Sequence, residues 1–240
     1  RSTLFPYTTL FRSNQRPDLW NVVENLAIAS GQPMPRVFII QDASPNAFAT
    51  GRTPEHSYVV VTSGLLKELD KRELTGVIAH EMSHIANYDI RVSMIVFGLV
   101  SAIGLISDIL LRTAFGAGRS DDDDSGSPYI YIVMIIVAIL SPIIAAMIQL
   151  AVSRQREYLA DSSAALLTRD PEGLIMALQK LDRSTRPLQR QNTATAHMYI
   201  VNPLKKGLLN RLFSTHPSIN DRIAPLVRSE ERRVGKECRS

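Results

Sequence analysis

Cysteine is nearly absent from this sequence, and so is a strong charge of either sign. Of the 240 residues only Cys238 is a cysteine, which excludes a small scaffold held together by disulfide bonds. The net charge is +4 and 45% of the residues are hydrophobic, which excludes a chain that is disordered throughout. Residues 1–13 contribute +2 and residues 229–240 contribute +1, so the body of the chain is almost neutral. We therefore expect no nucleic-acid partner.

The two ends of the chain differ from the rest. Residues 1–13 (RSTLFPYTTLFRS) and 229–240 (SEERRVGKECRS) continue no helical or strand period of their neighbours, and they resemble translated adapter sequence. We treat both as non-native ends and exclude them from the fold prediction. Genuine disordered tails are the alternative. The remaining body, residues 14–228, contains no cysteine, as is common in a reducing compartment.

Long hydrophobic runs, in contrast, occur twice. Residues 92–111 include 14 apolar residues and one charge, and residues 129–152 include 21 apolar residues of 24 and no charge. At about 1.5 Å per residue, a helix of either length crosses a hydrocarbon core of about 30 Å. Residues 116–128 between them are polar and rich in glycine, serine and aspartate. Residues 92–152 are thus predicted to form a transmembrane helical hairpin, with two buried core helices of a soluble protein as the alternative.

Basic residues indicate how this hairpin is oriented. Arg91, Arg154 and Arg156 flank the end that joins the rest of the chain, whereas the far end carries Arg112, Arg119 and four consecutive aspartates. By the positive-inside rule, the body of the chain is expected to face the cytoplasm. The lipid bilayer is therefore an expected partner.

The residues on both sides of the hairpin have the pattern of one soluble domain. Apolar residues at helical spacing predict helices over 17–30, 143–168, 171–184 and 218–227. Runs of β-branched residues predict strands over 36–41 and 57–62. The fold class is α+β and mostly helical, with a small β-sheet. Its two parts are residues 14–91 and 153–228.

The strongest chemical signal is the sequence His80-Glu81-Met82-Ser83-His84, inside a helix that begins with the capping-box pattern of Asp70 and Glu73. Residues four apart share one helical face, so both imidazoles can bind one metal ion while Glu81 lies beside it. Zinc in catalytic sites takes three protein ligands and a water, and a neighbouring glutamate acts as the base toward that water. The motif predicts one zinc ion per chain and peptide-bond hydrolysis. A surface helix that carries these residues by chance is the alternative.

The third ligand must come from a distant part of the chain, because no histidine or glutamate occurs within 70 residues after His84. The next glutamate is Glu157, and Asp161 lies one helical turn beyond it. His84 lies eight residues before the first hydrophobic run and Glu157 five residues after the second, so the hairpin returns Glu157 to the height of His84. Glu172 and Glu55 are the competing acids. The alternative for Glu157 is a solvated position in a charged run.

Four segments together resemble a known family: NAFATG at 46–51, HEMSHIANYD at 80–89, EYLAD at 157–161 and THPSINDRI at 215–223. With the hairpin, they are similar to the HtpX-type integral-membrane zinc metalloproteases, relatives of the CAAX prenyl proteases. The resemblance implies a zincin-like catalytic domain, in which His80, His84 and Glu157 bind zinc and Glu81 is the catalytic base. It also implies quality control at a bacterial or archaeal cytoplasmic (inner) membrane. The family has two further spans ahead of the matching region, so the chain is expected to be truncated at its N-terminus.

Two aspartates are expected to support the metal ligands. Asp161 and Asp89 are placed to accept an N–H of a ligand imidazole and so to fix its tautomer. The alternatives are a helix-surface charge for Asp161 and a cap or interfacial charge for Asp89.

Other residues are expected to contact the substrate. Asn46, Ala47 and Phe48 resemble a segment that holds an extended peptide along a sheet edge, with an ordinary turn as the alternative. His216 and Arg222 match the family's pattern and are expected to stabilise the developing oxyanion, with His197 as a further candidate for substrate contact. A structural role at a helix start is the alternative for His216.

The prediction from the sequence is a membrane-bound zinc endopeptidase that cleaves misfolded or damaged membrane proteins on the cytoplasmic side. A prenyl-protein protease would use the same chemistry, although that group has more spans. A non-catalytic membrane adaptor is a third possibility, but it has no need for the combination of His80, Glu81, His84 and Glu157.

Overall fold

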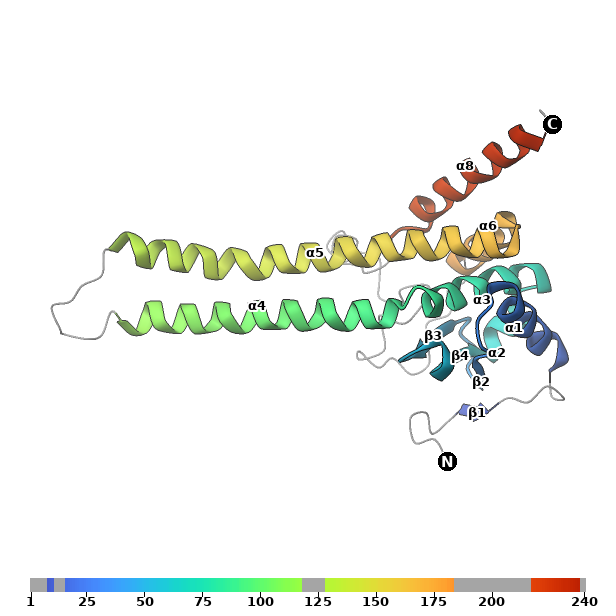
Figure 1. Cartoon of the computed structure of the whole chain (residues 1–240), viewed down its shortest axis with the longest axis horizontal. Helices are drawn as coiled ribbons and strands as arrows, with labels where there is room; N and C mark the ends of the chain where they lie inside the picture. Colours follow the sequence, from blue (N-terminus) through green and yellow to red (C-terminus); the bar gives the residue numbers. More distant parts are fainter. Residues whose placement is uncertain (1–7, 11–15, 118–127, 184–216, 238–240) are drawn as a thin grey trace. The chain divides into compact units, whose positions relative to one another are not determined.

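The protein is described by a computed structural model, which covers residues 8–10, 16–117, 128–183 and 217–237. The chain divides into two compact units, one formed by residues 1–90 and 154–240, the other by residues 91–153. The first unit contains the β-sheet and several helices, and the second consists of parts of two long helices (Figure 1). The chain is thus mostly helical with a small sheet, as the sequence predicted.

The sheet has four strands in the described residues: β1 (Thr8–Leu10), β2 (Arg36–Ile40), β3 (Ala47–Gly51) and β4 (Ser57–Thr62). Their order is β1-β2-β4-β3; β2 and β4 are parallel, and each outer strand is antiparallel to its neighbour. The two predicted strands are confirmed as β2 and β4. β1 lies in the segment that the sequence analysis set aside, and β3 begins inside the segment expected to bind substrate. Among the described strands, β3 therefore forms one edge of the sheet.

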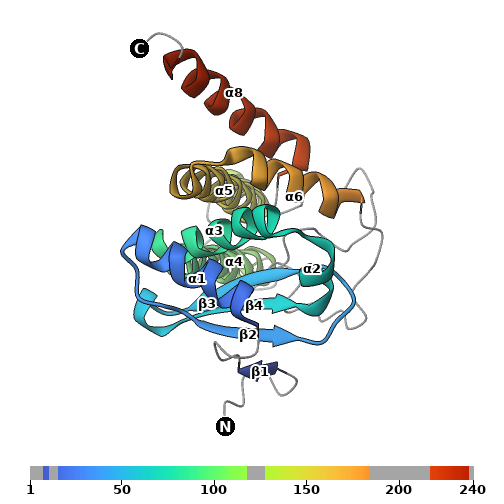
Figure 2. The same ribbon diagram turned by 90° about the vertical axis from the view of Figure 1, so that its right-hand side faces the viewer.

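Helix α3 (Lys71–Ala86) lies between the sheet and helix α6 (Pro171–Arg183), as Figure 2 shows. Its capping box is formed as predicted, because Asp70 and Glu73 each accept the other's backbone N–H. Two further helices complete this unit's N-terminal half, α1 (Pro17–Ser30) and the short α2 (Ser63–Glu68), and a 3-10 turn, η1 (Pro54–His56), joins β3 to β4. The shared core of these elements includes the buried side chains of Leu19, Val23, Val59, Leu65, Ile78, Met82, Leu174 and Leu178.

Helices α3 and α6 lie very close to each other at Gly76. A Cβ placed on Gly76 would lie 2.7 Å from the backbone nitrogen of Leu174 and 2.8 Å from its Cα, so no larger residue fits without movement of a helix. Gly76 precedes His80 by about one helical turn. The close packing of α3 on α6 therefore also fixes the direction in which the histidine motif points.

The second unit is formed by helix α4 (Asp89–Ala117) and helix α5 (Pro128–Thr168), which both continue into the first unit. Both are long and apolar enough to cross a membrane by length and composition. Their large apolar side chains are mostly exposed, among them Ile95 at 63% and Ile132 at 54%. Helix α5 continues through Pro142, which removes only one backbone hydrogen bond. Exposed apolar faces of this extent are expected of helices that contact lipid rather than of helices in a soluble core.

Candidate metal centre

Helix α3 presents the motif histidines on one face, as the four-residue spacing predicted. His80 and Glu81 are 2% and 5% exposed, and the His84 side chain is 18% exposed. The two imidazole rings lie edge to face, with their Nε2 atoms 3.1 Å apart. Both histidines thus direct Nε2 to a common point.

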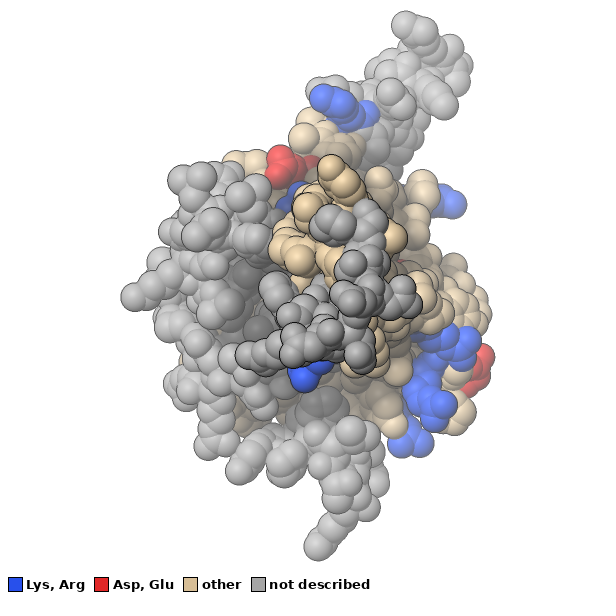
Figure 3. Space-filling model, turned by 90° about the vertical axis from the view of Figure 1, so that its left-hand side faces the viewer, with Lys and Arg blue, Asp and Glu red and all other residues tan. Residues whose placement is uncertain are grey.

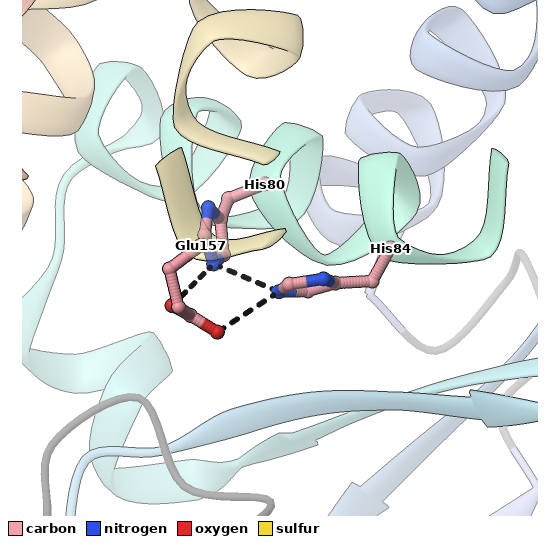
Figure 4. Close-up of side chains that lie close together, drawn as sticks. All are labelled: His80, His84 and Glu157. Atoms are coloured by element: carbon pink, nitrogen blue, oxygen red, sulfur yellow. Dashed lines mark hydrogen bonds and ion pairs between the residues drawn. The ribbon is translucent and has the colours of Figure 1, made fainter. Parts of the chain in front are cut away.

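Glu157, on α5, completes this group (Figure 4). Its Oε2 lies 3.7 Å from Nε2 of His80, and its Oε1 lies 3.7 Å from Nε2 of His84. The hairpin therefore does return Glu157 to the histidines, although Glu157 lies 73 positions after His84. Within the part of the chain that the structure describes, these three residues are the group that could hold a metal ion.

The competing carboxylates lie elsewhere. The Glu172 side chain is 54% exposed and forms an ion pair with Arg72 at 2.6 Å, next to Asp170. Glu55 lies in η1 and is exposed. Neither belongs to the metal-binding group among the described residues. Of the three acids weighed from the sequence, only Glu157 is brought to the histidines.

A carboxylate bonds to the outer nitrogen of each ligand imidazole. Asp161, one turn after Glu157 on α5, lies 2.9 Å from Nδ1 of His80, and Asp89 forms a hydrogen bond with Nδ1 of His84. An imidazole whose Nδ1–H is donated to a carboxylate has its Nε2 lone pair available for a metal. Both aspartates are thus in the positions that the sequence analysis expected.

The end of α3 explains how Asp89 reaches back to His84. The helix closes at Asn87, whose N–H donates to the carbonyl of Ser83, and Tyr88 then adopts a left-handed backbone with φ of 54°. A left-handed residue after a helix C-terminus reverses the direction of the chain. As a result, Asp89 begins α4 with its side chain against the last turn of α3.

Each of these aspartates also meets an arginine. Arg222, on helix α8 (Ile219–Glu237), is 1% exposed and binds Asp161 through Nε at 2.8 Å and through Nη2 at 2.6 Å. Arg156, which precedes Glu157 on α5, binds Asp89 through Nη2 at 2.9 Å. From the sequence, Arg222 is expected near the oxyanion. In the structure its Nε and Nη2 point to Asp161, and its Nη1 lies 3.5 Å from Glu157. The sequence indicates no site role for Arg156.

The residues present fit a zinc ion. Ligand atoms about 2 Å from a tetrahedral zinc lie roughly 3.3 Å from one another, close to the separations of 3.1 and 3.7 Å found here. The four carboxylates of the site carry four negative charges and the two guanidinium groups carry two positive ones, so neutral imidazoles leave a formal charge of −2. The carboxylates are those of Glu81, Asp89, Glu157 and Asp161. A divalent cation bound to this donor set is therefore balanced in charge.

Burial and neighbouring charges shift the pKa values of the site. Burial is the main cause that raises the pKa of Glu81 above its usual value, while the nearby histidines oppose this. Burial lowers the pKa of His84, but the hydrogen bond to Asp89 and the charges of Glu157 and Glu81 raise it overall. Burial likewise lowers the pKa of Arg222, and the bonds to Asp161 outweigh this, so the guanidinium stays charged.

Glu81 lies between the metal group and the edge of the sheet. Its Oε2 accepts the backbone N–H of Ala49, in β3, at 2.9 Å. The residues expected to bind substrate are next to this contact: Ala47 and Phe48 lie in β3 with buried side chains, and Asn46, which precedes them, is 3% exposed. His197 and His216 lie outside the described residues.

The site and the fold agree with comparisons to known proteins. A model of peptidase family M48 matches residues 13–230. A protease HtpX homolog of Tropheryma whipplei (strain Twist) is 54% identical over 214 residues, which cover 89% of this chain and 72% of the relative. A protease HtpX homolog of Dictyoglomus thermophilum is 51% identical over 216 residues, covering 90% and 70%.

A solved structure is also similar. The crystal structure of S. mikatae Ste24p matches with a TM-score of 0.57 and 21% identity over 91% of this chain, and the chain spans half the length of that protein. At this identity the match shows the fold, whereas the family model and the two relatives show the family. The chain therefore belongs to peptidase family M48, as a zinc metalloprotease similar to the HtpX proteases, with its metal site at His80, His84 and Glu157.

Proposed function

We propose that this metalloprotease is a membrane-bound endopeptidase that cleaves unfolded stretches of misfolded or damaged membrane proteins on the cytoplasmic side. The observation that carries the proposal is the hydrogen bond from the N–H of Ala49 to Glu81. It connects the glutamate beside the metal ligands to the outer edge of the sheet. A base, a metal site and a strand edge in direct contact are what the cleavage of an extended peptide requires.

The proposed chemistry uses Glu81 twice. Zinc held by His80, His84 and Glu157 would supply a water of lowered pKa and would polarise the carbonyl of the substrate. Glu81 accepts the proton of that water during the attack on the peptide carbon and then delivers it to the nitrogen of the leaving amine. Because burial raises the pKa of Glu81, the protonated form needed for the second transfer is less costly than for an exposed glutamate.

Further residues support this reaction in the proposal. Asp161 and Asp89 hold the ligand imidazoles in the tautomer that presents Nε2. Arg222 acts through Asp161, to which two of its N–H groups are bonded. His216 is the proposed donor to the developing oxyanion, and His197 the further candidate for substrate contact.

The outer edge of β3 is the proposed substrate site. The N–H of Thr62 donates to the carbonyl of Asn46, so Asn46 faces β4. Backbone groups alternate in direction along an antiparallel strand, which turns those of Ala47 and Ala49 to the outer edge. An extended peptide that pairs with Ala47 would enter next to Glu81. This mode of binding depends on backbone groups, so it accepts many sequences, as a quality-control protease needs.

The test is the cleavage of unfolded casein by zinc-loaded protein, with and without an ester in place of the Ala49 amide. Replacing Ala49 by lactic acid removes its N–H alone. We expect kcat to fall roughly 10-fold while bound zinc is unchanged, because the carboxylate of Glu81 loses the bond that orients it.

The matched control is the same ester at Ala47, where the proposed partner of the N–H is the substrate. There KM should rise while kcat changes little. An unchanged kcat for the Ala49 ester would contradict the role of this contact, and no cleavage by the zinc-loaded wild-type protein would favour the membrane adaptor.

The cytoplasmic orientation is supported by the distribution of charge. Arg91 and Arg154 lie at the ends of the hairpin next to the catalytic unit, and the connector carries four aspartates. On the face shown in Figure 3, the described Lys and Arg side chains are more prominent than Asp and Glu. Basic residues beside the ends of membrane-spanning helices are attracted to the anionic lipids of a cytoplasmic leaflet.

Cysteine labelling checks this orientation. In a variant with Ser125→Cys and Cys238→Ser, a membrane-impermeant thiol reagent should label the connector only from the extracytoplasmic side. The chain offers its own control, because Cys238 of the otherwise unchanged protein should be labelled only from the cytoplasmic side. Labelling of residue 125 from the cytoplasm would reverse the proposed topology.

A further inference from the structure

Two chains of contacts support the metal-binding histidines, and they have the same order of groups. One runs from His80 to Asp161 and on to Arg222. The other runs from His84 to Asp89 and on to Arg156, with 2.9 Å between Nη2 of Arg156 and Oδ1 of Asp89. In both, an imidazole meets a carboxylate and the carboxylate meets a guanidinium group.

Asp89 needs such a partner because it is buried. It is 4% exposed, and one of its oxygens is bonded to the imidazole of His84. A buried carboxylate without a partner of opposite charge is costly, and rotation toward solvent relieves that cost. Such a rotation would remove the acceptor that holds His84. The Arg156 side chain, itself only 13% exposed, supplies the compensating charge.

We propose that Arg156 is a positioning residue of the metal centre: it holds the carboxylate of Asp89 in place, and Asp89 in turn orients His84 toward zinc. The proposal rests on the zinc site of the proposed function. Arg156 and the ligand Glu157 are neighbours on α5, so one turn of this helix supplies a metal ligand and also the group that orients another ligand. The coordination of zinc by α3 therefore depends on α5 at three points: Arg156, Glu157 and Asp161.

A double-mutant cycle between Arg156 and Asp89 tests this. Zinc affinity is measured by competition with a chelator for the Arg156→Gln, Asp89→Asn and combined variants of the full chain. Arg156→Gln should weaken zinc binding roughly 10- to 100-fold, as is usual when the support of a ligand histidine is lost. In the Asp89→Asn background, the same change should alter the affinity by less than about 2-fold, because its partner is already missing.

The controls separate positioning from folding. Arg183→Gln removes the same charge from an exposed side chain on α6 and should leave zinc affinity as in the wild type. Arg156→Lys keeps the charge without the planar donor group, and its affinity should lie between those of the wild type and Arg156→Gln. The d–d spectrum of the cobalt-substituted protein should change in Arg156→Gln, because the imidazole of His84 turns.

The result that would overturn the proposal is a wild-type zinc affinity in Arg156→Gln, or additive effects of the two substitutions. If Arg156→Gln does not fold, Arg156→Lys decides. It should weaken zinc binding when Asp89 is present and change the affinity by less than about 2-fold in the Asp89→Asn background. Equal effects of Arg156→Lys in both backgrounds would refute the relay. Zinc affinity is measured without substrate, so a failure of the peptidase proposal, seen as no casein cleavage by the wild type, is a distinct outcome.

Discussion

Replacing Glu81 by glutamine should abolish proteolysis and leave zinc bound. The side chain keeps its size, and its carbonyl oxygen can still accept the N–H of Ala49, so the local structure has little reason to change. An amide cannot take a proton from water, however, and the loss of general-base catalysis should reduce kcat by at least about 100-fold. The measurement is casein cleavage together with the zinc content after dialysis.

Glu24→Gln is the matched control for this experiment. Glu24 lies on α1 with its side chain exposed and has no part in the site, so its removal changes the same charge in the same unit. Its activity should equal that of the wild type. Turnover by Glu81→Gln at the wild-type rate would show that another group acts as the base.

Much of the fold could be predicted because its elements carry local signals. The β-branched run of β4 predicted its bounds, and the capping pattern of Asp70 predicted the start of α3. β3 carries a weaker signal, since its sequence, AFATG, contains one β-branched residue and a glycine. The strand is held by pairing with β4 and by the contact of Ala49 with Glu81, and a local pattern cannot reveal either.

The metal group could be predicted because the spacing of its residues in the sequence limits where they can lie. His84 follows His80 by four positions on a helix, and the hairpin returns α5 to the same level. The arginines carry no comparable signal. Arg222 reaches Asp161 across 61 residues, and the bond from Arg156 to Asp89 depends on the left-handed turn at Tyr88. Such contacts follow from tertiary packing. From the sequence alone, an arginine that makes such a contact cannot be distinguished from an arginine at the surface.

Two control variants separate the loss of a ligand from the loss of its support. Asp161→Ala removes the acceptor of the His80 N–H and should weaken zinc binding roughly 10- to 100-fold without abolishing it. Glu172→Gln neutralises an exposed acid that pairs with Arg72 and should leave zinc binding unchanged. Loss of the ligand itself should weaken zinc binding more than either of these changes.

Glu157→Ala should lose both zinc and activity. It removes the carboxylate whose two oxygens lie 3.7 Å from the Nε2 atoms of His80 and His84, and alanine offers no donor in its place. It also changes the formal charge of the site from −2 to −1, which leaves Arg222 near an incompletely neutralised cation. With two ligands and less negative charge, the site should release zinc on dialysis, measured as metal per chain. A Glu157→Ala protein that retains one zinc per chain would show that another carboxylate is the third ligand.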